Sequence, residues 1–275
     1  MNVKQADAET VGGPIAVVLA AGRGTRMGSD LPKVVFEAAG KPLVRWVIDA
    51  LIAAGIRDTI VVVGHRADVV EAALAGLPGL SFALQREQRG TGDAVRAAAG
   101  LIEARLRDTP AGVSRPVVIV CGDSPMLRPE SVAGLLDEFS RRRAACLLGT
   151  AITTDAAGLG RIVRGPDGRF QGIVEERDAT RAERAIREVN MSTYIFEAGD
   201  LLAALARLDD ANAAGEYYLT DCPGLLLAAG KAVDAVTCLD ASETLSVNTP
   251  QQLAAVSAAL AARPAAAGNA GANGH

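Results

Sequence analysis

The first half of the chain alternates short apolar runs with stretches of helical periodicity. Helical patterns in PLVRWVIDALIAAG, in DVVEAALAG and over residues 92–105 separate the apolar runs IAVVLAA, TIVVVG, LSFALQ and PVVIVCGD. Parallel strands need a crossover connection, and a helix between successive strands provides it. The pattern therefore predicts an α/β fold with a mainly parallel sheet flanked by helices on both faces.

The second half has a different pattern. A helix SVAGLLDEFSRRR and a strand AACLLGT precede RIVRGPDGRFQGIVEERD and EVNMSTYIFEA, which hold extended runs around the turn 165–168. We expect a β-rich insertion here, then helices in GDLLAALARL and PGLLLAAG, a strand AVDAVTCLD and a helix beginning at Thr249-Pro250. The polar start and the Ala/Gly/Asn-rich end predict a flexible leader over 1–13, one domain over 14–262 and a disordered tail over 263–275.

The composition excludes several functional classes. The 275 residues carry 28 Lys and Arg against 32 Asp and Glu, so the net charge of -4 predicts neither a nucleic acid nor an anionic membrane as partner. No apolar run approaches the roughly 20 residues of a membrane-spanning helix. The 4 Cys and 2 His lack the spacing of a zinc site or a disulfide framework, which leads us to expect a cytoplasmic protein with reduced thiols.

A glycine-containing loop directly follows the first apolar run. Its sequence LAAGRGTRM, with Pro32-Lys33 shortly after, brings small residues and the cations Arg26 and Lys33 to the end of a strand. Backbone N–H groups in such a loop can close on a phosphate, although a tight glycine turn is the alternative. The loop lacks the GxxxxGKS, GxxxxGKT and GxGxxG patterns, which disfavours a P-loop NTPase or a dehydrogenase.

Two more polar segments follow later strands. Asp123 in CGDSP stands at the end of VVIV, where open α/β folds bind ligands and a single carboxylate suits Mg²⁺; a capping role is the alternative. Gln85 in LQREQRGTGDA offers the donor and acceptor needed to read a pyrimidine edge. For that segment alone, a polar loop with Thr91 as helix N-cap is the favoured interpretation.

The remaining candidates are polar residues beside apolar strands, and each could serve equally as a turn or cap residue. We expect His65 to be a structural loop residue, and the chain holds no GxSxG for acyl transfer on a serine. Spacing alone selects none of these candidates, which are Gly160 with Arg161, Glu175, Asn190, the loop 215–221 and Asn248.

Taken in order, these segments closely resemble the uridylyltransferase domain of the bifunctional GlmU family. The resemblance implies a Rossmann-like nucleotidyltransferase fold and an enzyme that transfers UMP from UTP to N-acetylglucosamine 1-phosphate, giving UDP-N-acetylglucosamine and pyrophosphate. It also implies Mg²⁺ as the cofactor. The matching stretches, between Ile15 and Leu260, are LAAGRGTRMGSDLPKVV, LQREQRGTGDA, CGDSP, GLGRIVRGPDGRFQGIVEERDAT, EVN, NAAGEYYLTD and SVNTPQQL.

The resemblance further implies a role for each candidate. The phosphates meet the catalytic cations Arg26 and Lys33, the metal meets Asp123 and Asn248, and the amino sugar meets Gly160, Glu175 and Asn190. Nucleotidyl transfer demands positioning and charge neutralisation rather than proton abstraction, which agrees with a site without histidine. The nucleotide-binding residues, of which the last three read the uracil, are Leu19, Ala20, Ala21, Gly22, Gly24, Thr25, Gln85, Gly90 and Thr91.

The chain departs from the family in two places. Asn190-Met191-Ser192 stands where the family usually has Asn-Thr-Gly, a change that either reshapes the sugar pocket or leaves it intact. The family's β-helix acetyltransferase has no counterpart in the sequence, so we expect any acetyltransferase step from a separate protein. Two alternatives stay open: a nucleotidyltransferase of the same fold with another nucleotide or sugar, and a catalytically silent nucleotide-sugar-binding regulatory domain.

Overall fold

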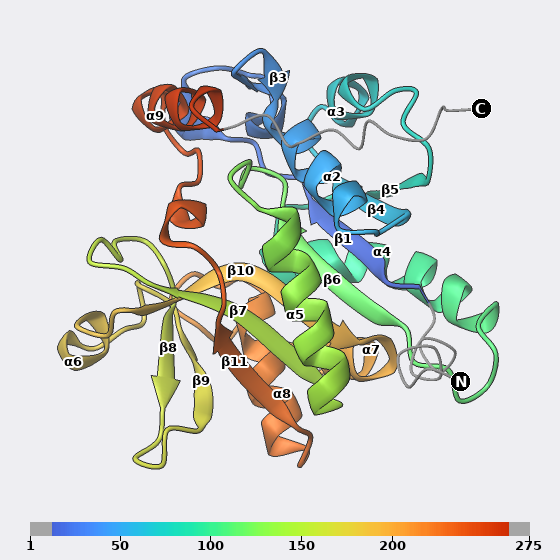
Figure 1. Ribbon diagram of the computed structural model, residues 1–275, viewed down its shortest axis with the longest axis vertical. Coiled ribbons are helices and arrows are strands. Elements are labelled where there is room, and N and C mark those ends of the chain that lie inside the picture. The colour runs from blue at the N-terminus through green and yellow to red at the C-terminus, as the bar shows by residue number, and fades with distance from the viewer. Residues whose placement is uncertain (1–12, 264–275) are drawn as a thin grey trace, which may run out of the picture.

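A central mixed sheet organises the computed structural model, which describes residues 13–263 (Figure 1). The leader and tail expected at the two ends lie outside the described residues, apart from one residue each. In sheet order the strands are β11 (Val233–Thr237), β7 (Cys146–Ile152), β10 (Glu188–Glu197), β6 (Pro116–Cys121), β1 (Ile15–Leu19), β4 (Asp58–Val63) and β5 (Leu80–Leu84).

Most neighbouring strands of this sheet run parallel, as the alternating pattern predicts. Strand β1 pairs in parallel with β4 and β6, β4 with β5, and β7 with β11. The residues of β1 from Ile15 to Val18 are fully buried because helices cover both faces of the sheet. The carboxyl ends of β1, β4, β5 and β6 therefore lie at one edge, where an open α/β sheet offers its binding crevice.

The segment 188–197 lies inside the main sheet and not in the insertion, which corrects the sequence-based expectation. Strand β10 runs antiparallel between β6 and β7. Its buried Tyr194, Ile195 and Phe196 point alternately to the two faces, as a central strand requires. The insertion itself is the hairpin of β8 (Arg161–Arg164) and β9 (Phe170–Val174), joined to β10 through Val189 and followed by the short helix α6 (Arg181–Arg184).

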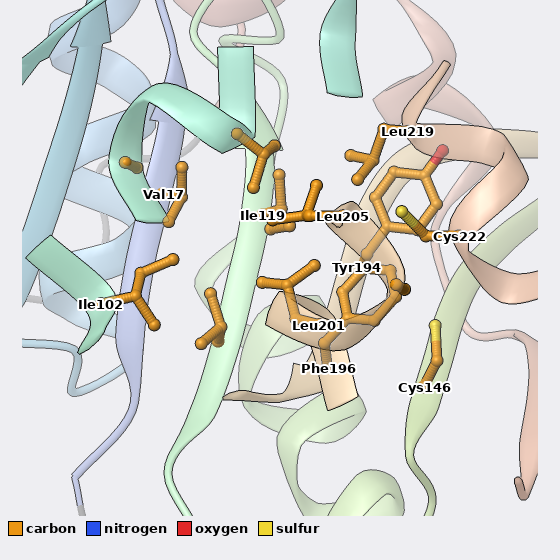
Figure 2. Close-up of a cluster of buried hydrophobic side chains, with 14 of the residues drawn as sticks. Val17, Ile102, Ile119, Cys146, Tyr194, Phe196, Leu201, Leu205, Leu219 and Cys222 are labelled. Atoms are coloured by element: carbon orange, nitrogen blue, oxygen red, sulfur yellow. The ribbon is translucent and has the colours of Figure 1, made fainter. Parts of the chain in front are cut away.

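Two apolar clusters fill the space between the sheet and its helices. One lies under α4 (Thr91–Arg107), α7 (Ala198–Leu205) and α8 (Cys222–Ala228), and Figure 2 shows Tyr194 and Phe196 among its aliphatic side chains. The other lies under α2 (Leu43–Ala53), α3 (Ala67–Ala73) and α5 (Pro129–Arg142). Because each fully buried large apolar side chain contributes about 1.5–3 kcal/mol, these clusters hold the strand ends in place.

A third, smaller cluster joins the end of the described chain to its beginning. Helix α9 (Pro250–Ala261) packs on the hairpin of β2 (Glu37–Ala38) and β3 (Lys41–Pro42), as Figure 1 shows. Thr249 caps α9 by accepting a hydrogen bond from the Gln252 N–H, so the helix begins where the sequence predicts. Within residues 13–263, no helix combines the length and apolarity needed to cross a membrane. The part of the chain that the structure describes also holds four 3-10 turns: η1 (Thr25–Met27), η2 (Lys33–Val35), η3 (Leu219–Asp221) and η4 (Ala241–Thr244).

Candidate active site

The polar segments that follow β1, β5 and β6 meet in one cleft at the carboxyl edge of the sheet. The volume of this cleft is about 360 Å³. The sequence-predicted residues that line it are Leu19, Ala21, Gly22, Gly24, Thr25, Arg26, Lys33, Gln85, Gly90, Thr91, Asp123 and Asn248.

Ala20 belongs to the expected nucleotide-binding set but does not line the cleft. It is buried, and its N–H donates a 2.8 Å hydrogen bond to the Val62 carbonyl. Ala20 therefore extends the pairing of β1 with β4 by one residue, and this pairing fixes the start of the loop. His65 also lies outside the lining, where its Nε2 contacts the Asp30 carbonyl oxygen at 2.9 Å, in agreement with a structural loop residue.

Gly24 lets the loop after β1 turn back against Lys33. Its φ of +67° lies in the left-handed region, which glycine adopts without steric cost. A Cβ atom at this position would lie 2.5 Å from the Lys33 Cβ atom. The glycine thus brings two cations, Arg26 in η1 and Lys33 in η2, to the same side of the cleft.

The Lys33 ammonium group joins two oxygen-bearing side chains. It donates a 2.7 Å hydrogen bond to Asn248 Oδ1 and forms an ion pair with the Asp123 carboxylate. The Lys33 and Asp123 side chains are 14% and 21% exposed, so a ligand in the cleft can reach the pair. Arg26 Nη2 also donates to Asn248 Oδ1, at 3.0 Å. A carboxylate oxygen, an amide oxygen and two cations therefore lie together in the cleft.

A long connection after β11 brings Asn248 to the side of the cleft that holds Asp123. The sequence pattern places Asn248 after a strand-like segment, but β11 ends at Thr237 in an edge strand of the sheet, and η4 intervenes. The carboxylate of Glu243 in η4 accepts hydrogen bonds from the Arg128 N–H and the Ser131 hydroxyl, which fixes this connection. The Val247 N–H then donates to the Asp123 carbonyl at 3.2 Å, which sets Asn248 beside the cleft.

Gln85 directly follows β5, the edge strand beside β4, and lines the same cleft as the two cations. Its N–H donates to the Val63 carbonyl at 2.8 Å, and the side chain is 4% exposed. Its Nε2 donates to Asp93 Oδ2 at 2.8 Å and to the Gly90 carbonyl at 3.2 Å. The amide is therefore held from the loop and from the first turn of α4.

Gly90 and Thr91 pack against the loop 215–221. Gly90 has a φ of +110°, and a Cβ atom there would lie 2.5 Å from the Tyr217 carbonyl oxygen. The N-cap of α4 is Gly90 and not Thr91, because the Thr91 hydroxyl accepts from the Leu219 N–H at 3.1 Å instead. The capping interpretation of Thr91 is therefore wrong, and its side chain ties two cleft segments together.

Gly160, Glu175 and Asn190 form a second group outside the cleft lining. The Asn190 N–H donates to the Gly160 carbonyl at 2.8 Å, and a Cβ atom on Gly160 would lie 3.6 Å from Glu175 Oε2. The Thr220 hydroxyl donates to Glu175 Oε1 at 2.9 Å. Burial raises the pKa of the Glu175 carboxyl, and the Thr220 hydrogen bond offsets part of this effect. Thr220 also lines a second cavity of about 290 Å³.

Ser192 occupies a bulge of β10 next to this second group. The pairing of β10 with β7 shifts register between Asn190 and Thr193, and Ser192 has a φ of +51°. A glycine here, as the resembled family usually has, would meet a backbone requirement in addition to any effect on a sugar. The Asn190 side chain turns inward, and its Nδ2 donates to the Tyr194 hydroxyl at 2.6 Å.

Several cleft residues escaped the sequence analysis. Gln88 and Glu216 stand in segments that it singled out, but no spacing distinguished them. Cys121 is the last residue of β6, where it pairs with Leu19 of β1, and it also lines the cleft. Burial and the neighbouring Asp123 carboxylate raise the pKa of the Cys121 thiol to about 12, so it stays protonated at neutral pH. Within residues 13–263 no three His, Cys, Asp or Glu side chains gather as a metal-binding group.

Curated proteins match most of this chain in sequence. The sequence is 44% identical over 239 residues to the bifunctional protein GlmU of Geobacter metallireducens, covering 87% of this chain and 48% of that protein. It is 46% identical over 256 residues to the bifunctional protein GlmU of Sorangium cellulosum, covering 90% of this chain and 52% of that protein. The chain thus spans about half the length of the curated relatives it matches.

The fold is shared with a solved nucleotidyltransferase. Apo UDP-glucose pyrophosphorylase superposes with a TM-score of 0.72 at 14% identity, covering 91% of this chain and 98% of that one. Nucleotidyltransferases of this type generally use a divalent metal. The family model described as a MobA-like NTP transferase domain matches residues 16–217. The chain therefore belongs to the MobA-like NTP transferase domain family and is a nucleotidyltransferase.

Proposed function

We propose that the chain transfers UMP from UTP to N-acetylglucosamine 1-phosphate, releasing pyrophosphate. The observation that carries the proposal is the meeting of Asp123, Asn248 and Lys33 beside a cleft that also holds Gln85. The identity of 44–46% to bifunctional proteins named GlmU supports the choice of reaction. Because the chain spans about half of those relatives, the proposal covers this transfer alone.

Arg26 and Lys33 would act on the phosphates of UTP. A sugar 1-phosphate is already an anionic nucleophile, so the reaction needs alignment and charge stabilisation more than a general base. Their two positive charges would stabilise the charge that builds on the α-phosphate and on the departing pyrophosphate. Removal of one preorganised charge-stabilising group typically lowers kcat by about 10²–10³-fold.

Asp123 and Asn248 would hold Mg²⁺. Carboxylate and amide oxygens are hard ligands, and Mg²⁺ keeps water and substrate phosphates in its other positions. Both side chains already accept from one cation, the Lys33 ammonium group, so their oxygens converge on a positive charge. When bound, Mg²⁺ would neutralise phosphate charge and orient the triphosphate. The Lys33 ammonium group would contact a phosphate oxygen of the nucleotide.

Gln85, Gly90 and Thr91 would contact the uracil, and the second group would contact the sugar. Glu175 and Asn190 bring a carboxylate and an amide beside Gly160, which suits a hydroxyl- and amide-bearing hexosamine. The Thr220 hydroxyl would keep the Glu175 carboxylate in place for this contact. We favour N-acetylglucosamine 1-phosphate over glucose 1-phosphate because both polar side chains are present.

The test is a panel of the four common nucleoside triphosphates against several sugar 1-phosphates, with Mg²⁺ and pyrophosphate release as the readout. The proposal predicts the highest kcat/KM for UTP with N-acetylglucosamine 1-phosphate. A preference for glucose 1-phosphate would change the sugar and leave the uridylyl transfer standing. No pyrophosphate from any pair, together with binding of a UDP-sugar, would favour a regulatory domain instead.

A further inference from the structure

We propose that Asp93 sets the choice between uracil and cytosine by fixing the orientation of the Gln85 side-chain amide. The inference rests on the proposed function, in which Gln85 meets the base of the nucleotide. It concerns a residue that the sequence analysis did not select. Asp93 is partly buried in the first turn of α4, and it is not among the described residues that line the cleft.

The two partners of the Gln85 amide determine which way it points. Nε2 donates to Asp93 Oδ2 at 2.8 Å and to the Gly90 carbonyl at 3.2 Å. A carboxylate and a backbone carbonyl accept hydrogen bonds and cannot donate them. The reversed amide would set its oxygen against both of these oxygens, which is unfavourable for a side chain only 4% exposed. The NH₂ group must therefore face Asp93.

The position of Asp93 in its helix reinforces this orientation. Asp93 is an acidic residue in the first turn of α4, where the helix dipole favours a negative charge. A carboxylate is a stronger acceptor than a neutral group, so the hydrogen bond from Gln85 is charge-assisted. Gly90 precedes the same helix, so both acceptors belong to one rigid end of α4.

The consequence is that Gln85 presents an acceptor to a ligand. Its NH₂ group is committed, no described residue donates to its Oε1, and the side chain lines the cleft. Uracil carries a donor at N3, which matches this oxygen. Cytosine placed in the same way would set its own N3 acceptor against the oxygen, and two acceptors facing each other in a buried site are disfavoured. Asp93 thus acts as a positioning residue through Gln85.

The test measures the dissociation constants of UTP and CTP, with Mg²⁺, for the full chain and three variants. The wild type should favour UTP by about ten- to a hundredfold. Asp93→Ala should lower the ratio of the two affinities by about five- to tenfold, because only the longer 3.2 Å hydrogen bond to the Gly90 carbonyl then disfavours the reversed amide. Asp93→Asn should keep the ratio within about twofold, since its oxygen accepts the same hydrogen bond while Gly90 still requires the NH₂ group. Glu103→Ala, at an exposed acidic residue of α4, is the matched control and should change nothing.

The ratio separates positioning from a structural effect. A folding defect in Asp93→Ala would weaken UTP and CTP alike and leave their ratio unchanged, and that result would overturn the inference. A wild type that prefers UTP, with a ratio that persists in Asp93→Ala, would also overturn it but leave the proposed function standing. A wild type without preference between UTP and CTP would overturn the proposed role of Gln85 as well.

Discussion

The Lys33 Nζ atom lies 2.7 Å from Asn248 Oδ1, although 215 positions separate the two residues in the sequence. The same ammonium group forms an ion pair with Asp123. One lysine therefore connects the loop after β1, the end of β6 and the segment before α9. Asp123 and Asn248, the two residues proposed to hold a divalent metal, both contact this side-chain cation.

Removal of the Lys33 side chain should strengthen metal binding and weaken catalysis. In Lys33→Ala, Asp123 and Asn248 lose the cation that they share, and only Arg26 still contacts Asn248. Without nucleotide, the variant should therefore bind Mn²⁺ several-fold more tightly than the wild type. Turnover should fall by about 10²–10³-fold, because a phosphate-stabilising charge is lost. Titration of Mn²⁺ followed by electron paramagnetic resonance measures the first effect. Lys41→Ala, which breaks the Lys41–Asp49 ion pair elsewhere on the surface, is the control. Unchanged or weaker Mn²⁺ binding in Lys33→Ala would contradict the account.

Asp123→Ala should remove turnover while leaving the fold intact. We expect a loss of at least about 10²-fold in kcat, because the carboxylate would hold the metal. The thermal midpoint should change little, because the side chain is partly exposed and its carbonyl still accepts from the Val247 N–H. Asp49→Ala breaks another Lys–Asp ion pair and should keep full activity. Near-normal turnover of Asp123→Ala in Mg²⁺ would refute the metal assignment.

Ser192→Gly should stabilise the protein. Ser192 holds a φ of +51°, and relief of that conformation outweighs the greater flexibility of an unfolded glycine by about 0.5–1 kcal/mol. Urea unfolding measures the difference. Ser140→Gly in the last turn of α5 is the matched control, and it should lower the free energy of unfolding by at most about 0.5 kcal/mol. Equal effects of the two substitutions would show that the bulge does not strain Ser192.

Glu175 should make stability depend on pH in a defined direction. Burial raises its pKa above the usual 4.5, so the folded state favours the protonated form. The stability from this group is complete below pH 4.5 and is lost as the pH rises through the raised pKa. Glu175→Gln, which still accepts from Thr220, should therefore gain stability relative to the wild type as the pH rises from 4.5. Urea unfolding over this range tests the trend, with the exposed Glu103→Gln as control. A relative loss of stability at higher pH would contradict it.

The sequence predicts features of the fold that depend on the local pattern of residues. It does not predict features that depend on contacts between distant segments. The period of apolar residues identified β1 and α2, because it depends on which face a residue buries. The same period could not distinguish β10 as a central strand from part of an insertion, because both place apolar residues beside a turn. The hydrogen bond from the Val247 N–H to the Asp123 carbonyl and that from the Gln85 amide to the Asp93 carboxylate join separate segments. No spacing in the sequence predicts such contacts.

The central claim is that this chain moves UMP onto a sugar phosphate at the Asp123 cleft. The most direct measurement follows UTP radiolabelled at its α-phosphate, incubated with N-acetylglucosamine 1-phosphate and Mg²⁺, and separates the products by chromatography. The account predicts that the label appears in UDP-N-acetylglucosamine with the wild type and not with Asp123→Ala, and that a label at the γ-phosphate leaves as pyrophosphate. An α-phosphate label that stays in UTP, or a γ-phosphate label that moves onto the sugar phosphate, would contradict it.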